Sequence, residues 1–258
     1  MTANRKSAAA SGRQEERGPQ GPERILACFP AFNEAGKIGT AVRRVPPGVV
    51  DEIVVVDDGS TDATVAEAQA AGATVIRNAG RSGVGFAILR GIDYAVAHGF
   101  SIIVVLAGNN KDDPTEIPRL VQPILEEGYH FVQGSRYLAR GRHGGMPLYR
   151  RLATRYLHPL LFSLAAGRRI TDSTNGFRAF RTSILEDARI DLRQPWLRHY
   201  ELEPYLFLKV IRLGYRVKEV PVTKIYPPKR LGYTKMTPIT GWWSILRPIL
   251  YVGLGLRK

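Results

Sequence analysis

Between residues 53 and 62 the chain reads IVVVDDGSTD, an apolar run that stops abruptly at acidic and turn-forming residues. Residues Ile53–Val56 are all β-branched and uncharged, as in a strand that is buried on both faces of a parallel sheet. The six residues that follow, Asp57 to Asp62, are all polar or glycine. The stretch therefore predicts a buried strand whose carboxyl end opens into a polar loop.

The same pattern recurs along the chain, with short apolar runs that alternate with helix-like segments. The further strands expected are Ile25–Phe29, Thr74–Ile76, Ile102–Leu106 and His130–Val132, and the helices expected are Glu34–Val45, Ala63–Ala71, Gly83–Ala97 and Thr115–Glu127. Continuous apolar strands separated by helices indicate an α/β fold with a Rossmann-like, mostly parallel sheet flanked by helices.

Ligands bind such sheets beyond the carboxyl ends of their strands. The segments there are polar, glycine-rich or acidic, and they comprise residues 30–34, 57–62, 78–83 and 108–114. In the segment 57–62, capping of the next helix explains the presence of Ser60 or Thr61. It does not explain the adjacent carboxylates of Asp57 and Asp58. No G-x-G-x-x-G or Walker-type loop is present, which argues against dinucleotide-binding and P-loop proteins.

Positive charge is concentrated in the second half of the chain. The 258 residues include 37 Lys and Arg against 23 Asp and Glu, a formal net charge of +14. Eight arginines and no acidic residue lie between Arg136 and Arg169, and eleven Lys and Arg accompany one acidic residue, Glu219, from Lys209 to Lys258. Such a field favours phosphorylated substrates, anionic lipid or nucleic acid. Because no nucleic-acid-binding motif is present, no nucleic-acid partner is expected.

The two ends of the chain differ from its middle. Residues 1–23 are rich in Ser, Gly, Gln and charged residues and lack the apolar core of a secretory signal, so a disordered basic tail is expected. The stretch 241–256 is apolar, but Arg247 and Pro248 interrupt it and it is shorter than the ~20 residues of a spanning helix. The single cysteine excludes a disulfide framework. These features favour a cytoplasmic protein with one domain over residues 24–240.

Several motifs follow one another in an order that resembles one enzyme family. The first two are PAFNE at residues 30–34 and VDDGSTD at residues 56–62. The later ones are Asn78–Arg81, Gly134–Tyr137, Gly176–Arg178, Glu219–Val222 and Arg230–Lys235. Together they resemble family 2 glycosyltransferases of the GT-A fold, and in particular polyprenyl-phosphate glycosyltransferases of the dolichol-phosphate mannose synthase type. The similarity covers roughly residues 24–240.

The resemblance implies a donor site at the strand ends. By similarity, the residues that lie against the base and ribose of a nucleotide are Pro30, Phe32 and Glu34. Asp58, or its neighbour Asp57, resembles the carboxylate that contacts the base, and Arg81 falls near the donor. A nucleotide needs an acceptor for the edge of its base, an apolar wall and donors for its phosphates, and these residue types supply them.

The segment after the fourth strand departs from the family pattern. Relatives typically carry Asp-x-Asp there and hold a divalent metal on the diphosphate of the donor, whereas this chain has Ala107 and Asn109 at the two positions. Mg²⁺ and Mn²⁺ prefer carboxylate oxygens. The expected cofactor is therefore Mg²⁺ or Mn²⁺ held by Asn109 and a displaced carboxylate, Asp112 or Asp113, with Asp112 favoured as a metal ligand and a catalytic residue. The alternative is that Lys111, a donor-site residue, neutralises the diphosphate directly.

The basic run downstream implies an acceptor site. By resemblance, Arg136 and one of Arg150 or Arg151 hold the phosphate of the acceptor, because guanidinium groups bind phosphate through two parallel hydrogen bonds. Arg136 is also expected to be catalytic, as is Asp172, which would help to orient the acceptor. The other acceptor-binding residues implied are Arg178, Arg230 and Lys235. The five histidines show no ligand spacing and are expected to be ordinary surface or core residues.

The last segment, residues 241–258, is expected to form an amphipathic helix. Its apolar residues are Trp242, Trp243, Ile245, Leu246, Ile249, Leu250 and Tyr251, with Arg247, Arg257 and Lys258 nearby. Such a helix can pack on the core of the protein. It can also lie at the interface of an anionic membrane, where Trp and basic residues are common. Both interpretations remain open.

The pattern and the resemblance together predict an inverting glycosyltransferase. It would move a hexose from a nucleotide-diphosphate sugar of the GDP-mannose or UDP-glucose type to a polyprenyl phosphate, at the cytoplasmic face of a membrane. The ionised acceptor phosphate needs no strong general base, so catalysis would depend on positioning two anions and stabilising the leaving diphosphate. Two alternatives are transfer to a small-molecule acceptor and an inactive nucleotide-sugar binding protein, which the altered segment at 107–109 would suit.

Overall fold

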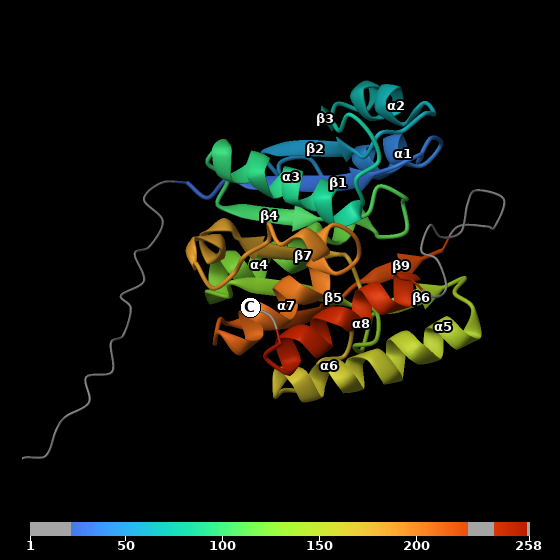
Figure 1. The fold of residues 1–258 in the computed structure, drawn as a ribbon. Coiled ribbons are helices and arrows are strands. Elements are labelled where there is room, and N and C mark those ends of the chain that lie inside the picture. Colours follow the sequence, from blue (N-terminus) through green and yellow to red (C-terminus); the bar gives the residue numbers. More distant parts are fainter. Residues whose placement is uncertain (1–21, 227–239, 257–258) are drawn as a thin grey trace, which may run out of the picture.

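The computed structural model describes residues 22–226 and 240–256, which form a central sheet with helices on both faces (Figure 1). The seven strands of this sheet lie in the order β3-β2-β1-β4-β7-β5-β8. Their bounds are β1 Ile25–Ala31, β2 Glu52–Asp57, β3 Thr74–Arg77, β4 Ile102–Val105, β5 Phe131–Ser135, β7 Arg178–Arg181 and β8 Val217–Pro221. The α/β fold and the five strands predicted from apolar runs are confirmed, each to within a few residues.

All neighbouring strands are parallel except those on either side of β7, which runs antiparallel to both β4 and β5. The carboxyl ends of β1, β2, β4 and β5 therefore lie at one edge of the sheet, and the amino end of β7 joins them there. The mostly parallel sheet is confirmed. The antiparallel strand was not predicted, because its four residues, RAFR, show no distinctive apolar run.

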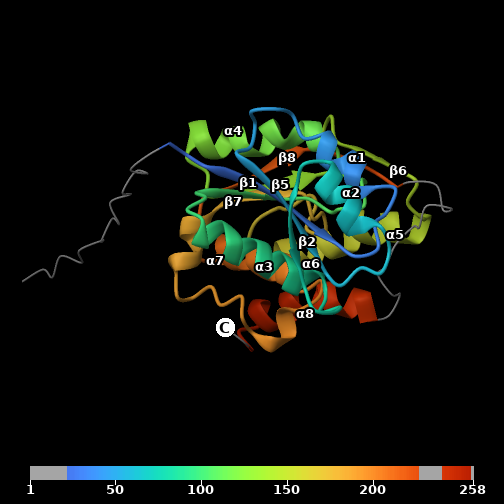
Figure 2. The same ribbon diagram turned by 90° about the horizontal axis from the view of Figure 1, so that it is seen from above.

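The strands contribute side chains to two apolar cores, one on each face of the sheet, because successive side chains point to opposite faces. In β1, Leu26 and Cys28 belong to one core and Ala27 and Phe29 to the other. On the first face pack α3 (Val84–Ala97), α6 (His158–Ala166), α7 (Leu202–Arg212) and α8 (Thr240–Gly253), and on the second pack α1 (Ile38–Arg43), α2 (Thr64–Ala70) and α4 (Ile117–Glu127). Figure 2 shows α4 across the sheet from α3, α6 and α8.

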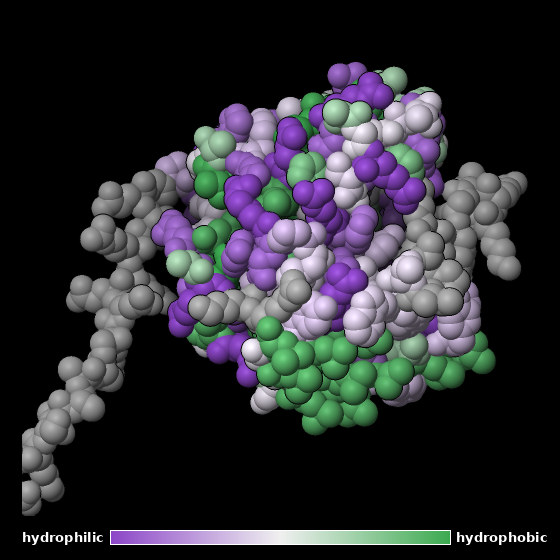
Figure 3. Space-filling model, in the orientation of Figure 1, coloured by the Kyte–Doolittle hydropathy of each residue, from purple (hydrophilic) through white to green (hydrophobic). Residues whose placement is uncertain are grey.

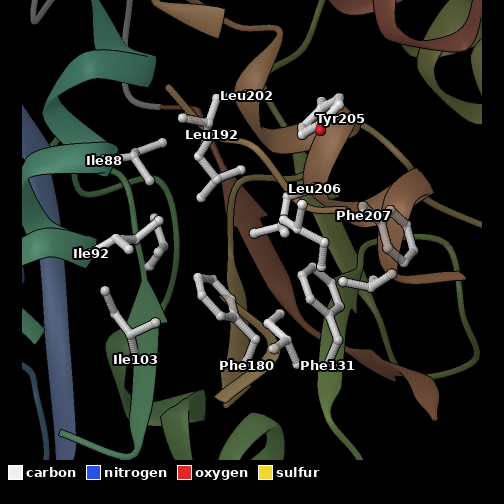
Figure 4. Close-up of a cluster of buried hydrophobic side chains, with 14 of the residues drawn as sticks. Ile88, Ile92, Ile103, Phe131, Phe180, Leu192, Leu202, Tyr205, Leu206 and Phe207 are labelled. Atoms are coloured by element: carbon white, nitrogen blue, oxygen red, sulfur yellow. The ribbon is translucent and has the colours of Figure 1, made fainter. Parts of the chain in front are cut away.

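The larger core holds the two halves of the sheet together (Figure 4). Phe131 of β5 stacks on Phe180 of β7 and on Phe207 of α7, with ring centroids 5.7 Å and 5.2 Å apart. Ile88 and Ile92 of α3 lie in the same cluster. The strand ends that carry the polar loops are therefore fixed relative to one another by apolar packing.

Two short helices begin later than predicted. The helix predicted over Glu34–Val45 begins at Ile38, because the backbone amides of Asn33 and Glu34 donate to Ser60 Oγ (2.8 Å) and Thr64 Oγ1 (2.7 Å). The helix predicted over Thr115–Glu127 consists of a 3-10 turn, Pro114–Glu116, followed by α4. Further 3-10 turns span Thr182–Glu186 and Pro195–Leu197.

A helical segment that was not predicted spans residues 148–166. It consists of α5 (Leu148–Leu152), a π-helical turn (Ala153–Leu157) and α6, and it ends at Gly167 in the left-handed conformation that favours glycine. The wide turn ends two residues before Pro159, whose ring would clash with the carbonyl of residue 155 in a regular helix. Beside this segment, β6 (Arg142–Gly144) pairs with β9 (Thr223–Ile225).

The predicted terminal segments are described only in part. Of the tail predicted over residues 1–23, residues 1–21 lie outside the described ranges, whereas Glu23 forms a 2.5 Å salt bridge with Arg181. The predicted C-terminal helix is present as α8, which packs against α6 and α7. Within residues 22–226 and 240–256, no helix is long and apolar enough to cross a bilayer.

Candidate active site

A cavity of about 690 Å³ lies at the edge where β1, β2 and β4 end. Its walls include ten of the residues singled out in the sequence: Pro30, Phe32, Glu34, Asp58, Arg81, Asn109, Lys111, Arg136, Arg150 and Arg178. Four others, namely Asp57, Asp112, Arg151 and Asp172, are not part of the lining. Arg230 and Lys235 fall outside the described residues. Most of the predicted positions are thus brought together in one cavity.

Asp58 holds the loop after β3 against the loop after β2. Its Oδ1 accepts hydrogen bonds from Asn78 Nδ2 (3.0 Å) and the amide of Ser82 (2.8 Å), and its Oδ2 accepts from the amide of Gly83 (2.8 Å). Close approach requires glycine at position 59, where a Cβ would lie 2.8 Å from the carbonyl carbon of Gly80. A carboxylate offers about four acceptor sites, so Asp58 keeps capacity for a ligand.

Asp57 has a different role from its neighbour. It accepts from the amide of Ser60 (3.2 Å) and forms a 3.3 Å ion pair with Arg77, and it is not part of the cavity lining. Successive side chains in a strand point to opposite faces, which separates the two adjacent carboxylates. Of the two aspartates that the sequence left as alternatives, the structure places Asp58 at the cavity and Asp57 in the turn.

The loop after β1 supplies an aromatic wall and a charged pair. The guanidinium of Arg81 stacks over the ring of Phe32, 4.6 Å from its centroid. Glu34 forms a salt bridge with Lys37, which also lines the cavity. This wall combines the apolar ring of Phe32 with the positively charged side chains of Arg81 and Lys37, a combination that suits a nucleotide.

The residues after β4 do not fit a divalent metal. Asp112 is 2 % exposed, and its carboxylate pairs with Lys224 Nζ (2.6 Å) and the amide of Ala107 (3.3 Å). Asp113 caps the turn at Thr115 and pairs with Arg44 (2.7 Å). Within the described ranges, no group of three or more His, Cys, Asp or Glu is placed to hold a metal ion. The Asp112 carboxylate is paired with Lys224 in this structure, and its role as a metal ligand stays a prediction.

Cations gather at this end of the cavity instead. Lys111, Lys224 and Arg150 all line it, and Lys111 Nζ lies 4.4 Å from the ring centroid of Tyr226. Burial, together with the neighbouring charges of Lys224 and Arg150, lowers the pKa of Lys111 to about 7. Lys224 was missed in the sequence, where it stands two residues beyond the Glu219–Val222 motif and far from its partner Asp112.

Arg136 and Asp172 form a buried, two-fold ion pair. Arg136 Nε donates to Asp172 Oδ2 (2.6 Å) and Nη2 donates to Asp172 Oδ1 and Thr174 Oγ1 (both 2.7 Å). The guanidinium has five N–H donors, and these contacts use three of them. Arg136 reaches the cavity wall, whereas Asp172 stands behind it. The structure therefore places Asp172 as the partner that orients Arg136.

Two acids position the rest of this wall. Glu219 accepts hydrogen bonds from the amides of Thr171 (2.9 Å) and Asp172 (3.0 Å). The acidic residue of the Glu219–Val222 motif therefore holds the backbone that carries Asp172. Glu203 lies 3.3 Å from Arg178 Nη2, and the carbonyl of the same residue accepts from Arg178 Nη1 (2.8 Å). Burial lowers the pKa of the Arg178 guanidinium. At this end of the cavity, Arg136 is fixed by the buried carboxylate of Asp172, and Arg178 is fixed by Glu203 and backbone carbonyls.

Several lining residues have no counterpart in the predicted set. They come from the loop before α7 and from α8, and they include His199, Tyr200, Trp242 and Ser244. The loop lies against α3, where a Cβ at Gly83 would come within 2.4 Å of the carbonyl oxygen of Arg198. A reading of strand ends cannot find these residues, because neither segment follows a strand of the sheet.

Comparisons with known proteins agree with this architecture. The model of the family described as glycosyl transferase family 2 matches residues 27–189. Polyprenol monophosphomannose synthase of Mycolicibacterium smegmatis is 31% identical over 222 residues, which cover 83% of this chain and 82% of that protein. Undecaprenyl-phosphate mannosyltransferase of Micrococcus luteus is 28% identical over 220 residues, with 83% and 88% covered. Glucosyl-3-phosphoglycerate synthase of Mycobacterium tuberculosis, solved with Mn²⁺, UDP and phosphoglyceric acid, is 24% identical, with a TM-score of 0.64 and with 88% of this chain and 78% of that chain covered.

Proposed function

Because the chain belongs to glycosyl transferase family 2 and is a glycosyltransferase, we propose that it transfers a hexose from a nucleotide-diphosphate sugar to a polyprenyl phosphate. One observation carries this proposal: a single cavity joins a wall suited to a nucleoside to a wall of arginines suited to a phosphate. The polyprenyl-phosphate enzymes among its relatives support the same pair of substrates.

The nucleoside would bind between Asp58 and the stacked pair of Phe32 and Arg81. A ring such as that of Phe32 offers an apolar face to the donor. Asp58 offers an acceptor for N–H groups of the base, held in place by the amides of Ser82 and Gly83. The diphosphate would then extend toward Asn109 and Lys111, at the end of β4.

The acceptor phosphate would bind at Arg136, Arg150 and Arg178. Two of these guanidinium groups are already oriented by Asp172 and Glu203, so little side-chain entropy is lost when they bind an anion. In the reaction, an oxygen of the acceptor phosphate attacks C1 of the hexose while the bond from C1 to the diphosphate oxygen breaks, and the configuration inverts. The acceptor is ionised near neutral pH, so no group has to remove a proton from it.

A broad apolar surface beside this wall supports a lipid acceptor. Its exposed leucines lie on the segment 148–166, at the end of α8 and just after it, and they are Leu148, Leu152, Leu157, Leu160, Leu161, Leu164, Leu250, Leu254 and Leu256. Figure 3 shows apolar side chains gathered where α6 and α8 lie in Figure 1. Soluble proteins rarely expose a continuous patch of this kind unless it binds something. The basic residues Arg151 and Arg155 of the same segment suit an anionic membrane.

The sequence placed membrane contact on residues 241–258 alone. In the structure α8 uses Ile245, Ile249 and Val252 to pack on the protein, and Leu164 of α6 is, at 72 %, the most exposed leucine among residues 22–226 and 240–256. The proposed membrane surface therefore centres on the segment 148–166, with the end of α8 beside it.

A transfer assay tests the proposed reaction. The enzyme is incubated with radiolabelled GDP-mannose or UDP-glucose and a polyprenyl phosphate, and label is followed into the organic phase. We expect organic-phase label with one of the donors. Label that appears only on added 3-phosphoglycerate would favour a small-molecule acceptor, and binding without transfer or hydrolysis would favour an inactive binding protein.

A flotation assay with vesicles tests the membrane surface. Replacing Leu160 and Leu164 with Glu should lower binding to vesicles that contain phosphatidylglycerol by about tenfold or more, since each buried leucine contributes ~1.5–3 kcal/mol. The control is Leu125→Glu on α4, an exposed leucine on the other face of the sheet. Equal binding by all variants would contradict this surface.

A further inference from the structure

Two lysines meet in the cavity wall at the end of β4. Lys111 follows that strand, and Lys224 lies in β9. The amide of Ile225 donates to the carbonyl of Lys111 (2.8 Å), and Asp112 forms an antiparallel bridge with Lys224. Both side chains line the cavity. The backbone pairing thus brings two lysine side chains from distant parts of the chain to one site.

The carboxylate of Asp112 forms an ion pair with Lys224 and does not line the cavity. Its Oδ1 lies 2.6 Å from Lys224 Nζ, and it is itself almost completely buried. A strong short ion pair restricts the rotamers of the lysine side chain, which would otherwise be free to move. Asp112 is therefore a positioning residue, and its position behind Lys224 explains why a carboxylate near the end of β4 does not reach the cavity.

The charges at this end do not cancel. Lys37, Lys111, Arg150 and Lys224 all line the cavity, against two carboxylates: Asp112, which pairs with Lys224, and Glu34, which pairs with Lys37. Asn109 of the same loop also lines the cavity, is neutral and accepts from the amide of Lys111 (3.2 Å). A cavity wall with net positive charge and low dielectric favours an anion more strongly than the same charges do in water.

We infer that Lys111 and Lys224 take the place of a divalent cation on the donor diphosphate. This inference rests on the proposed function. When the bond from C1 of the hexose breaks, negative charge builds up on the leaving diphosphate, and the two ammonium groups stabilise it by charge-assisted hydrogen bonds. Because the lysines are part of the folded chain itself, the enzyme binds and releases its nucleotide without a metal ion.

Calorimetry with UDP and GDP tests this inference directly. The titration uses the full chain in EDTA, and then in Mn²⁺ and in Mg²⁺. We expect the same Kd in all three buffers for whichever nucleotide binds. A nucleotide that binds only when Mn²⁺ or Mg²⁺ is present would overturn the inference.

Two variants address the lysines. In EDTA, Lys111→Gln should raise the Kd for the nucleoside diphosphate by about tenfold to a hundredfold, the effect typical of a lost hydrogen bond to a charged group. The second variant combines Lys224→Gln with Asp112→Asn, so that no unpaired carboxylate is left buried, and we expect a similar loss. The control is Lys218→Gln, which removes the same charge at an exposed salt bridge with Glu127.

The outcomes separate this inference from the proposed function. Metal-free binding that neither lysine variant weakens, in proteins that melt as the wild type does, would overturn the role of the lysines. If neither UDP nor GDP binds in any buffer and no label is transferred, the proposed donor class is contradicted as well. The nucleoside monophosphates UMP and GMP should lose less affinity in the lysine variants than the diphosphates do.

Discussion

The proposed donor end and the proposed acceptor end of the cavity are held in place by different forces. At the donor end, Asp58 fixes neighbouring loops through hydrogen bonds to neutral amide groups. At the acceptor end, buried ion pairs between Arg136 and Asp172 and between Arg178 and Glu203 form the wall. A buried charge that loses its partner costs far more than a neutral amide that turns to water. Changes at the acceptor end should therefore threaten the fold, whereas changes at the donor end should mainly affect binding.

The largest effect is expected for Asp172→Ala. The variant leaves the Arg136 guanidinium, which is 3 % exposed, without its carboxylate. Breaking one partner of a buried pair costs about 3–5 kcal/mol, so the midpoint of urea unfolding should fall markedly. The control is Arg193→Ala, at an exposed pair with Asp93 that should contribute nothing measurable. Equal midpoints for the two variants would remove the contrast between the two ends.

Asp58→Ala should affect ligand binding more than the fold. We expect nucleoside-diphosphate affinity to fall by about 1.5–3 kcal/mol, because a charged acceptor for the base is lost and the loop at 78–83 is released. Asp57→Ala is the matched control, since that carboxylate serves the turn and the pair with Arg77. It should lower stability and leave the Kd nearly unchanged. Unchanged affinity in a folded Asp58→Ala protein would place the base elsewhere.

Acid should loosen the acceptor side of the molecule through His158. The ring accepts from Ser173 Oγ at Nδ1 (2.7 Å) and donates from Nε2 to the carbonyl of Ile245 (3.0 Å), and burial lowers its pKa to about 4. The unfolded chain takes up this proton near pH 6.5 and the folded protein only near pH 4. Stability is therefore lost as the pH falls from 6.5 toward 4, by about 2 kcal/mol at pH 5.

Urea unfolding at pH 7 and at pH 5 measures this loss. His158→Gln keeps a donor and an acceptor but cannot titrate, so its stability should fall less than that of the wild type over the same interval. The difference between the two proteins isolates the histidine from the carboxylates that titrate nearby. The same slope for both proteins would show that His158 is charged in the folded state.

The smallest effect distinguishes two adjacent arginines. Arg150 lines the cavity and Arg151 does not, although they are chemically identical. In detergent, Arg150→Ala should raise the KM for polyprenyl phosphate about tenfold, as expected for a lost charge-assisted contact, without changing the affinity for the nucleotide. Arg151→Ala should leave both values near those of the wild type. If Arg151→Ala has the larger effect on KM, the acceptor binds on the outer face of the helix.

The donor end could largely be predicted from the sequence, because its residues follow parallel strands directly. The apolar run at 53–56 places Asp58 at the sheet edge, and the same reasoning places Phe32 and Arg81. The acceptor end could be predicted only in part. The segment 148–166 was read as a run of arginines, because its π-helical turn and Pro159 interrupt a regular helical pattern. The role of Lys224 depends on Asp112, which is 112 residues away, and no local pattern carries such a pairing.

The position of Arg178 depends on the register in which the antiparallel strand β7 pairs with β4. Arg178 is the first residue of this strand and stands opposite Val105 of β4, while Ala179 stands opposite Val104. If the strand paired one position out of step, every side chain would exchange faces. The guanidinium of Arg178 would then lie among Leu120 and Val121 of α4, far from Glu203. Correct pairing of one four-residue strand therefore decides whether the folded protein has the proposed phosphate site or a charge buried in an apolar core.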